Sequence, residues 1–568
     1  MTAEERSRII SEDYADLLIE YNSDDKVIKA FPDATIVPIN FSLSVAHVPI
    51  GNITNDTIRE FGYSVMPSCL GPVSHGSLEA SGVFRLRSIP NFNLRGQGVL
   101  IGILDSGIDY TNPIFRNADG TTRIAAIWDQ TIVSDQMPEG FFYGTEYTRE
   151  QINQALQSEN PLEIVPTTDE NGHGTMVAGI AGGNDVPDED FSGVAPNVEF
   201  IVVKLKPAKK YLKDFFFIKE DALCYQENDI SFALEYLIDV YARLAKPMAI
   251  CIAVDTSQSS HDGRGTLSSY LSILATTYGI AVVIAAGNEG NARRHYYGIV
   301  NKTVGFDSVE LNVGENETGF SMELWGQRPS IYSIDILSPS GEYVPRISVG
   351  LDEFREISFI FERTRIYIDF QMVESQSGDQ LILFRFDQPT AGIWTIRVYE
   401  RGDLNLGYNI WLPMEGFISN TTYFIRSDPY TTILTLGCTT TPITVSAYNI
   451  VDDSLYQNAS RGYTRSGEIK PDFAAPGVNM IGPAPNQTFS LYTGTSVSAA
   501  HTTGLAAILL EWGIVKNNIP TMSTIEMKKL MIRGARRDEN MEYPNRDWGY
   551  GIVDIFNVFD SLRTEIVV

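Results

Sequence analysis

Most of the chain after residue 97 alternates between short, continuously apolar runs and longer stretches with apolar residues every three or four positions. The stretches 230–245 and 265–279 have the helical spacing. The apolar runs are GVLIGILD (98–105), VEFIVVKL (198–205), PMAICIAV (247–254) and GIAVVIAAG (279–287). Continuous apolar strands are typical of parallel sheets that are covered on both faces. The alternation therefore predicts an α/β fold with a mostly parallel sheet and helices on both faces.

Residues from about 300 to 435 break this rhythm. Short alternating segments such as GFSMELWG (319–326) and IWTIRVYE (393–400) are separated by turn signals such as SPSGE (338–342). This pattern predicts an all-β sandwich. Because the α/β pattern returns from 432, we expect the β segment to be inserted into the α/β domain.

The first 70 residues mix short helix-like and strand-like pieces and predict a small α+β unit. The segment MPSCLGPVSHGSLEASG (66–82) is rich in small and turn residues, which predicts a linker. The beginning of the chain, MTAEERSRIISEDYADLL, has no apolar core of a secretory signal. We therefore expect cytoplasmic synthesis without a signal peptide.

Composition narrows the classes of partner. The chain has 43 Lys and Arg against 71 Asp and Glu, which gives a net charge of −28. Such a surface disfavours nucleic acids and acidic membranes as partners. No apolar run approaches the roughly 18 residues of a membrane span. The four cysteines lie far apart without a CxxC pair, and we expect buried free thiols.

Three polar residues stand at predicted element ends beside glycines. Asp105 ends an apolar strand in ILDSG, His173 lies between two glycines in DENGHGT, and Ser496 precedes a helical run in TGTSVSAAH. Each has a structural alternative when taken alone: a turn carboxylate, a buried structural histidine and a helix N-cap. In open α/β sheets, however, sites form outside the carboxyl ends of the strands.

Together these residues fit nucleophilic catalysis. A serine hydroxyl needs a base to take its proton, histidine is such a base near neutral pH, and a buried carboxylate orients the imidazole. Asn288 follows the apolar run 279–287. Its amide and the Ser496 backbone N–H are candidate donors to an oxyanion, although an asparagine in a strand-ending turn is common.

The motifs in this order resemble those of the subtilisin-like serine proteases. They are DSG (105–107), NGHGT (171–175), GVAP (193–196), AAGN (285–288), KPDFAAPG (470–477) and GTS (494–496). The resemblance implies an Asp105–His173–Ser496 triad, an oxyanion hole with Asn288, and a packing role for His501. It also implies substrate-binding backbone at Ala253, Val254, Asp255, Ala286 and Gly287.

One departure from the family bears on substrate preference. The substrate-binding strand of the family usually carries Ser-Leu-Gly, where this chain has Ala253, Val254 and Asp255. An aspartate at that position predicts either a preference for basic side chains or a narrower cleft.

A closer resemblance is to the clostridial Csp germination proteases and related bacterial subtilases. TRIAAIWDQT (122–131), GFFYGTEYTREQINQAL (140–156) and a jelly-roll-like insertion carry it. It implies that the N-terminal unit is a prodomain that chaperones folding and is then cut off by the enzyme itself within 66–77. The implied organisation is a prodomain (1–75), a protease domain in two parts (76–300 and 434–568) and the inserted jelly-roll domain (301–433).

These observations predict a serine endopeptidase that acts on a protein or peptide, with the zymogen of a spore cortex-lytic enzyme as the expected substrate and the spore as its expected location. A catalytically silent regulator that binds protein partners is the alternative from another class, although all three triad residues are present. A carbohydrate-binding insertion is a third hypothesis, based on tryptophans that are more often core residues (Trp325, Trp394 and Trp411). Calcium sites are frequent among subtilases, but without an EF-hand-like loop no cofactor or metal is predicted.

Overall fold

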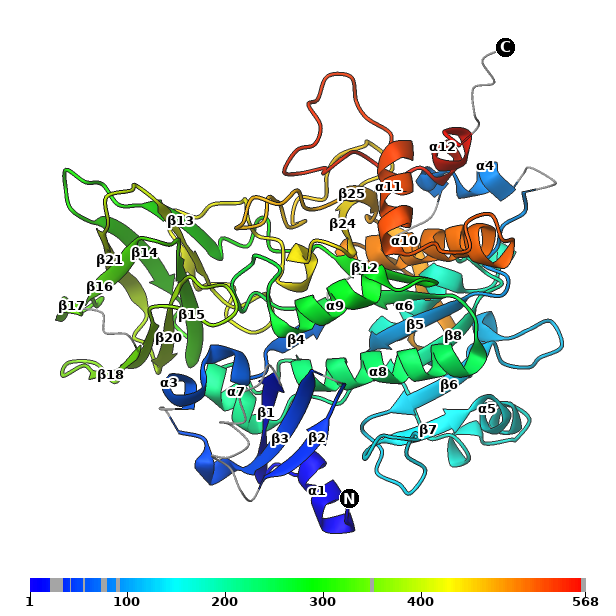
Figure 1. Ribbon diagram of the computed structural model, residues 1–568, viewed down its shortest axis with the longest axis horizontal. Coiled ribbons are helices and arrows are strands. Elements are labelled where there is room, and N and C mark those ends of the chain that lie inside the picture. The colour runs from blue at the N-terminus through cyan, green and yellow to red at the C-terminus, as the bar shows by residue number, and fades with distance from the viewer. Residues whose placement is uncertain are drawn as a thin grey trace.

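The computed structural model describes residues 1–20, 34–40, 42–54, 57–72, 79–87, 92–347 and 352–562. At its centre lies an eight-stranded sheet with the strand order β25-β24-β12-β10-β5-β8-β6-β7 (Figure 1). Every neighbouring pair is parallel except β6 with β7. The strands are β5 (Leu100–Asp105), β6 (Ile124–Asp129), β7 (Thr145–Thr148), β8 (Glu199–Lys204), β10 (Met248–Ile252), β12 (Ile280–Ala285), β24 (Ile443–Tyr448) and β25 (Phe473–Pro476).

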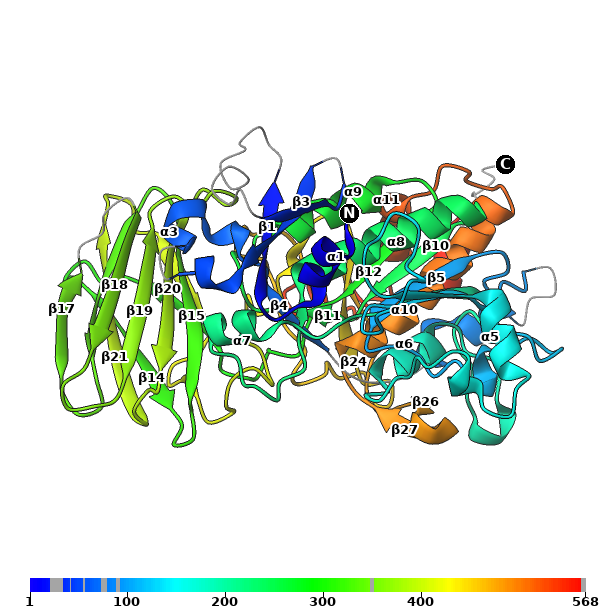
Figure 2. The same cartoon turned by 90° about the horizontal axis from the view of Figure 1, so that it is seen from below.

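Helices cover both faces of this sheet, as the apolar runs predict. On one face Ile101 and Ile103 of β5 share a core with α6 (His173–Gly182) and α10 (Thr495–Leu510). On the other face Leu100 and Leu104 pack with α8 (Glu227–Leu244) and α9 (Thr266–Thr276) (Figure 2). Outside the N-terminal unit, the structure also describes α4 (Val83–Arg87), α5 (Arg149–Leu156), α7 (Lys210–Phe216), α11 (Thr524–Gly534) and α12 (Ile555–Asp560). The predicted α/β fold is confirmed.

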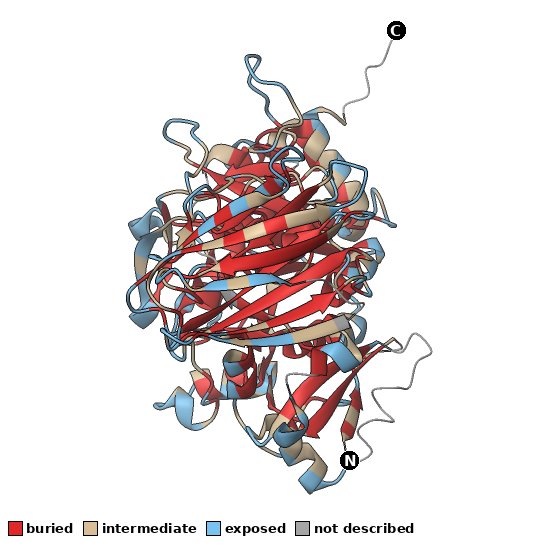
Figure 3. Ribbon diagram, turned by 90° about the vertical axis from the view of Figure 1, so that its left-hand side faces the viewer, coloured by how far each residue is buried: buried red, intermediate tan, exposed pale blue. Residues whose placement is uncertain are grey.

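Between β12 and β24 the chain forms a separate body of antiparallel strands, which we call the β-unit (residues 295–424). Its two sheets have the orders β13-β22-β15-β20-β19-β18 and β17-β16-β21-β14-β23. Their inner faces share one core, in which Leu324, Ile334 and Trp394 are fully buried (Figure 3). The strands are β13 (His295–Ile299), β14 (Asp307–Val313), β15 (Gly319–Gly326), β16 (Ile331–Leu337), β17 (Tyr343–Ile347), β18 (Asp352–Ser358), β19 (Arg365–Gln371), β20 (Gln380–Asp387), β21 (Gly392–Arg401), β22 (Gly407–Trp411) and β23 (Tyr423–Phe424).

The N-terminal unit packs below the helices α7 and α8 in Figure 1. Its antiparallel sheet has the order β1-β3-β2. Leu17 and Ala46 lie in one core with α7, and Leu18 and Val45 lie in another with α8. Its elements are α1 (Ala3–Ile10), β1 (Tyr14–Glu20), β2 (Thr35–Pro38), β3 (Leu43–Pro49) and α3 (Thr57–Phe61).

A buried polar cluster joins the N-terminal unit to the rest of the chain. The Asp16 carboxylate accepts hydrogen bonds from Lys209 Nζ at 2.8 Å and from Gln226 Nε2 at 3.0 Å, and it contacts His47 Nδ1 at 2.6 Å. Burial alone would raise the pKa of Asp16, but the charge of Lys209 and these bonds outweigh burial and hold the pKa well below its ordinary value. Removal of one partner would leave a buried charge unpaired, which is strongly unfavourable.

Three expectations from the sequence can be compared with the structure. The four cysteines are buried free thiols, as predicted. Trp325, Trp394 and Trp411 are all buried, which agrees with core positions and leaves no exposed aromatic platform at these three residues for a sugar. Within the described part of the chain, no helix has both the length and the apolar character that a membrane crossing requires.

Candidate active site

The predicted site residues come from three elements whose ends meet at one edge of the central sheet. Asp105 is the last residue of β5, His173 is the first residue of α6, and Ser496 is the second residue of α10. The strand order reverses beside β5: β8 and β6 lie on one side, and β10, β12 and β24 lie on the other. This is the switch point at which α/β sheets form their sites.

Hydrogen bonds connect the three side chains in series. His173 Nδ1 lies 2.8 Å from both carboxylate oxygens of Asp105, and His173 Nε2 lies 3.2 Å from Ser496 Oγ. Asp105 and Ser496 are 0% exposed to solvent, and His173 is 4% exposed. The imidazole can therefore take the hydroxyl proton at Nε2 while the carboxylate holds the proton on Nδ1.

Glycines on either side of His173 allow this close approach. A Cβ added at Gly174 would lie 2.2 Å from the Gly107 carbonyl oxygen, so any other residue would push α6 away from the end of β5. Gly172 has φ = +81°, a left-handed conformation that disfavours other residues. A Cβ added there would lie 3.0 Å from Pro485, in the turn between β26 (Met480–Ala484) and β27 (Thr488–Tyr492). The two glycines thus fix the position of the imidazole.

Asn288 follows β12 by three residues and lies beside the start of α10. Its Oδ1 accepts hydrogen bonds from the backbone N–H of Thr495 at 3.2 Å and from the Thr495 hydroxyl at 3.3 Å. These bonds orient the amide, with the NH2 as its donor end. The Ser496 N–H belongs to the first turn of α10, where N–H groups have no intrahelical acceptor and the helix dipole favours negative charge.

Two positioning residues were missed in the sequence analysis. Thr495 fixes Asn288 as described above. Asp169 joins the segments that carry the acid and the base: its Oδ1 accepts bonds from Ser106 Oγ at 2.8 Å and from Gly172 N at 2.9 Å, and its Oδ2 accepts bonds from Thr175 N and Oγ1 at 2.8 and 2.6 Å. The carboxylate in DENGHGT, four residues before His173, was the available signal.

A strand from the N-terminal unit lies against the predicted substrate-binding backbone. Residues 66–82 were predicted to be a linker, but Cys69–Pro72 form strand β4. This strand pairs antiparallel with β11 (Val254–Asp255) on one side and with β9 (Tyr225–Gln226) on the other (Figure 2). A turn-rich sequence forms a strand here because two neighbours supply the hydrogen bonds. In the described structure β4 pairs with Val254 and Asp255, whereas its register does not reach Ala286 or Gly287.

The side chain of Asp255 does not face an open cleft. Its carboxylate is fully buried and accepts hydrogen bonds from the backbone N–H groups of Thr256, Leu436 and Gly437 at 2.7, 2.9 and 3.1 Å. The carboxylate thus joins β11, the predicted substrate-binding strand, to the short helical turn Leu436–Cys438. The expected preference for basic side chains at this position is not supported by that geometry, because the carboxylate is already used by backbone donors.

The buried carboxyl group of Asp255 should make the free energy of unfolding depend on pH. Burial raises the pKa of this carboxyl from 3.8 to about 7, although its hydrogen bonds act in the opposite direction. The folded state therefore binds more protons than the unfolded state between these values, and stability falls as the pH rises through them, by about 1.4 kcal/mol per pH unit. We expect the difference in unfolding free energy between the wild type and Asp255→Asn to decrease from pH 5 to pH 7 in urea titrations. A difference that does not change with pH would contradict this assignment.

His501, five residues after Ser496, lies away from this hydrogen-bond series. It is fully buried, and its Nε2 lies 2.5 Å from Ser81 Oγ. Burial lowers the pKa of His501 to about 3, so the ring is neutral near pH 7. These contacts fit packing. Among the described residues, no three His, Cys, Asp or Glu side chains are grouped so that they could hold a metal ion.

The family assignment follows from comparison with known proteins. A model of the subtilase family matches residues 96–313 and 426–551, which together are more than half of the chain. The chain therefore belongs to the subtilase family.

Individual relatives are proteases by name. The solved structure of the Clostridium perfringens CspB protease is 30% identical, with a TM-score of 0.75 over 85% of this chain and 97% of that chain. A PII-type proteinase of Lacticaseibacillus paracasei is 23% identical over 83% of this chain, and a C5a peptidase of Streptococcus pyogenes is 21% identical over 81%. The chain spans only 26% and 39% of the lengths of these last two proteins.

Proposed function

We propose that this chain is a serine endopeptidase that hydrolyses peptide bonds through Asp105, His173 and Ser496. The observation that carries the proposal is the contact of His173 with Asp105 at one ring nitrogen and with Ser496 at the other. This is the arrangement that converts a hydroxyl into a nucleophile.

The mechanism follows from the geometry. Ser496 Oγ attacks the scissile carbonyl carbon as its proton passes to His173 Nε2, and the Asp105 carboxylate stabilises the imidazolium that forms. The Asn288 amide and the Ser496 N–H donate to the carbonyl oxygen as it becomes negative. His173 then protonates the leaving amine, and a water molecule repeats the sequence on the acyl-enzyme and restores Ser496.

We further propose that the first substrate is the chain itself. Strand β4 adds to β11 and β9 in the manner of an extended peptide on a sheet edge. It runs antiparallel to β11, so the chain leaves Pro72 toward the beginning of β11 and the end of the neighbouring β10. Of the junction predicted within 66–77, residues 73–77 lie outside the described residues, and we expect cleavage there, directly after β4. The N-terminal unit is then a prodomain.

The expected substrate in trans is a protein. The resemblance to the clostridial Csp germination proteases favours a spore-associated role in which the enzyme activates the zymogen of a cortex-lytic hydrolase. The alternative, a silent regulator, predicts the same fold with a hydroxyl that does not react.

Intact-mass spectrometry with a fluorophosphonate tests the proposal. A serine activated by a base reacts with this reagent, whereas ordinary serines do not. We expect a purified chain that has lost 72 to 77 N-terminal residues and carries one adduct, which peptide mapping assigns to Ser496. An unlabelled chain of full length would favour the silent regulator.

A further inference from the structure

A polar cleft of about 510 Å³ opens between the β-unit and the loop 462–467 of the subtilase part. Its volume lies within the range of roughly 300–1,000 Å³ that is typical of ligand sites. Its lining contains four arginines and three aspartates, with no lysine or glutamate, whereas the whole chain has 43 basic and 71 acidic residues. The lining of the cleft is therefore more basic than the chain as a whole. The arginines are Arg264, Arg328, Arg465 and Arg546.

The acidic groups of the lining already have partners. Arg465 is buried, and it bonds Asp379 Oδ2 at 2.8 Å and Asp262 Oδ2 at 3.3 Å. Arg328 lies 3.8 Å from the other oxygen of Asp379. The third aspartate, Asp428, accepts a hydrogen bond from a backbone N–H at 2.9 Å. The two arginines balance the charges of Asp262 and Asp379, whereas Asp428 keeps its charge and is held by a backbone donor.

Two arginines at the rim are not neutralised by an acidic partner in the described structure. The Arg546 guanidinium lies 4.9 Å from the ring centre of Tyr430 and 5.5 Å from that of Tyr463, contacts that orient the group and leave its charge in place. The Arg264 side chain is exposed and makes no hydrogen bond or ion pair with the described residues. Guanidinium groups bind carboxylates through paired N–H donors.

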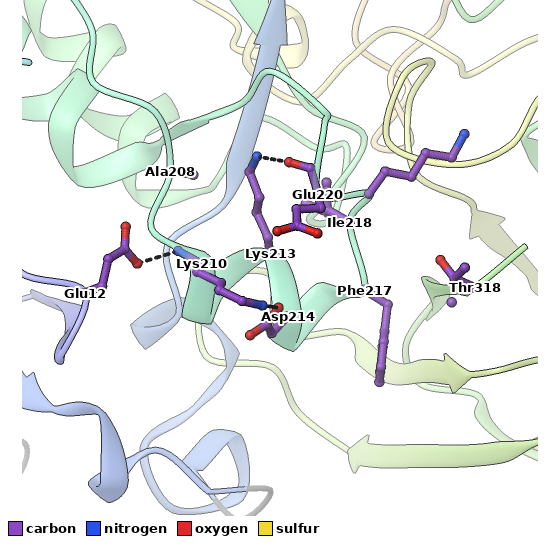
Figure 4. A pocket seen from close by; sticks show the side chains of 11 residues that line it. Glu12, Ala208, Lys210, Lys213, Asp214, Phe217, Ile218, Glu220 and Thr318 are labelled. Atoms are coloured by element: carbon purple, nitrogen blue, oxygen red, sulfur yellow. Dashed lines mark hydrogen bonds and ion pairs between the residues drawn. The ribbon is translucent and has the colours of Figure 1, made fainter.

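A second cavity offers a contrast. The cavity of about 390 Å³ in Figure 4 is lined by three lysines and three acidic residues. Lys210 pairs with Asp214 at 2.6 Å, and Lys213 donates to the carbonyl oxygens of Glu220 and Ala222 at 3.0 and 2.7 Å. Its charges are balanced and most are satisfied within the protein, so it is not selective for an anion.

The arginine cleft is connected to the oxyanion donors by a short stretch of chain. Ser460, two residues before the loop 462–467, donates from its N–H to the Gly287 carbonyl at 2.9 Å and accepts from the Glu289 N–H at Oγ, also at 2.9 Å. It thus holds both neighbours of Asn288. The segment 460–467 therefore contributes both to the lining of the cleft and to the position of Asn288.

We propose that this arginine cleft binds an acidic segment of the protein substrate, at a site separate from the strands that bind the scissile peptide. That the bound protein is a substrate rests on the proposed function, but the binding itself does not require catalysis. The ligand class is a peptide with several aspartate or glutamate side chains.

The test measures binding to the full-length Ser496→Ala chain, so that it is independent of activity. The probe is a fluorescein-labelled peptide with six glutamates spaced by Gly-Ser, and the matched probe carries glutamine in their place. We expect fluorescence anisotropy to show binding of the glutamate peptide only, weakened by 0.3 M salt because exposed charges are screened. Adding Arg264→Ala and Arg546→Ala should weaken binding about tenfold.

The control variant removes two exposed arginines outside the cleft, Arg401 and Arg533, and should bind the glutamate peptide as before. Equal binding of the glutamine peptide, or equal weakening in the control, would overturn the proposal. Complete displacement of the peptide by inorganic phosphate at the same concentration would indicate a simple anion site and would also overturn the proposal. If the double variant does not fold, the single variants Arg264→Ala and Arg546→Ala replace it, and binding of the glutamate peptide that neither weakens would overturn the proposal. If the fluorophosphonate labels the wild type but the glutamate peptide does not bind, the proposed binding site is disproved and the proposed activity stands.

Discussion

Replacing Ser496 by alanine will leave the purified chain at its full 568 residues and abolish peptide hydrolysis. The substitution removes the oxygen that lies 3.2 Å from His173 Nε2 and changes little else, because the side chain is buried at the start of α10. We expect kcat to fall by roughly 10⁶-fold, the loss known for the same change in subtilisin, from which the magnitude is taken. Intact mass and hydrolysis of a fluorogenic peptide measure the two effects.

Ser498 provides a matched control on the same helix. It is also fully buried, but its hydroxyl donates to the carbonyl oxygens of Ala475 and Pro476 at 3.1 Å and does not contact His173. Ser498→Ala should lower thermal stability and leave processing intact. Loss of the N-terminal unit in Ser496→Ala under protease-free conditions would disprove the assignment of the nucleophile.

The second large effect is expected for Asp105→Asn. The carboxylate accepts from His173 Nδ1 at both oxygens and from the Ser106 N–H at 2.7 Å. An amide of the same size keeps the packing but cannot hold the proton on Nδ1 in the productive tautomer. We expect kcat to fall by roughly 10⁴-fold, with KM and the melting temperature little changed.

The variant Asp169→Asn distinguishes the role of Asp105 in holding the Nδ1 proton of His173 from a general effect of negative charge near the site. Asp169 bonds Ser106, Gly172 and Thr175, the neighbours of the acid and the base, rather than the imidazole. Its loss should displace His173 slightly and reduce kcat by about 10²-fold or less. If the two variants lost the same activity, the special role of Asp105 would have to be abandoned.

The sequence was sufficient for strands β5, β8, β10 and β12 of the central sheet and for the convergence of the site. These four strands are buried on both faces, so their apolar runs are unbroken, and the polar residues that follow them must lie at one edge. The same reasoning gave Asp105, His173, Ser496 and Asn288, because each stands at, or within three residues of, the end or beginning of such an element.

What could not be predicted depends on contacts between distant parts of the chain. Strand β4 has the composition of a turn and becomes a strand only between β9 and β11, which lie more than 150 residues away in sequence. The direction of the Asp255 carboxylate depends on N–H groups at 436 and 437, some 180 residues later. Thr495 acts by orienting an amide on another segment, which no local pattern reveals.

The covalent attachment of β4 has a consequence for the time course of activity. A strand that belongs to the same chain is a tethered competitor, with an effective concentration on the order of millimolar that dilution does not change. A peptide in solution displaces it only at comparable concentrations. If the proposed self-cleavage occurs, turnover in freshly made enzyme should therefore begin after a lag whose length is independent of enzyme concentration, because it is set by the intramolecular cleavage that frees β4 from its tether.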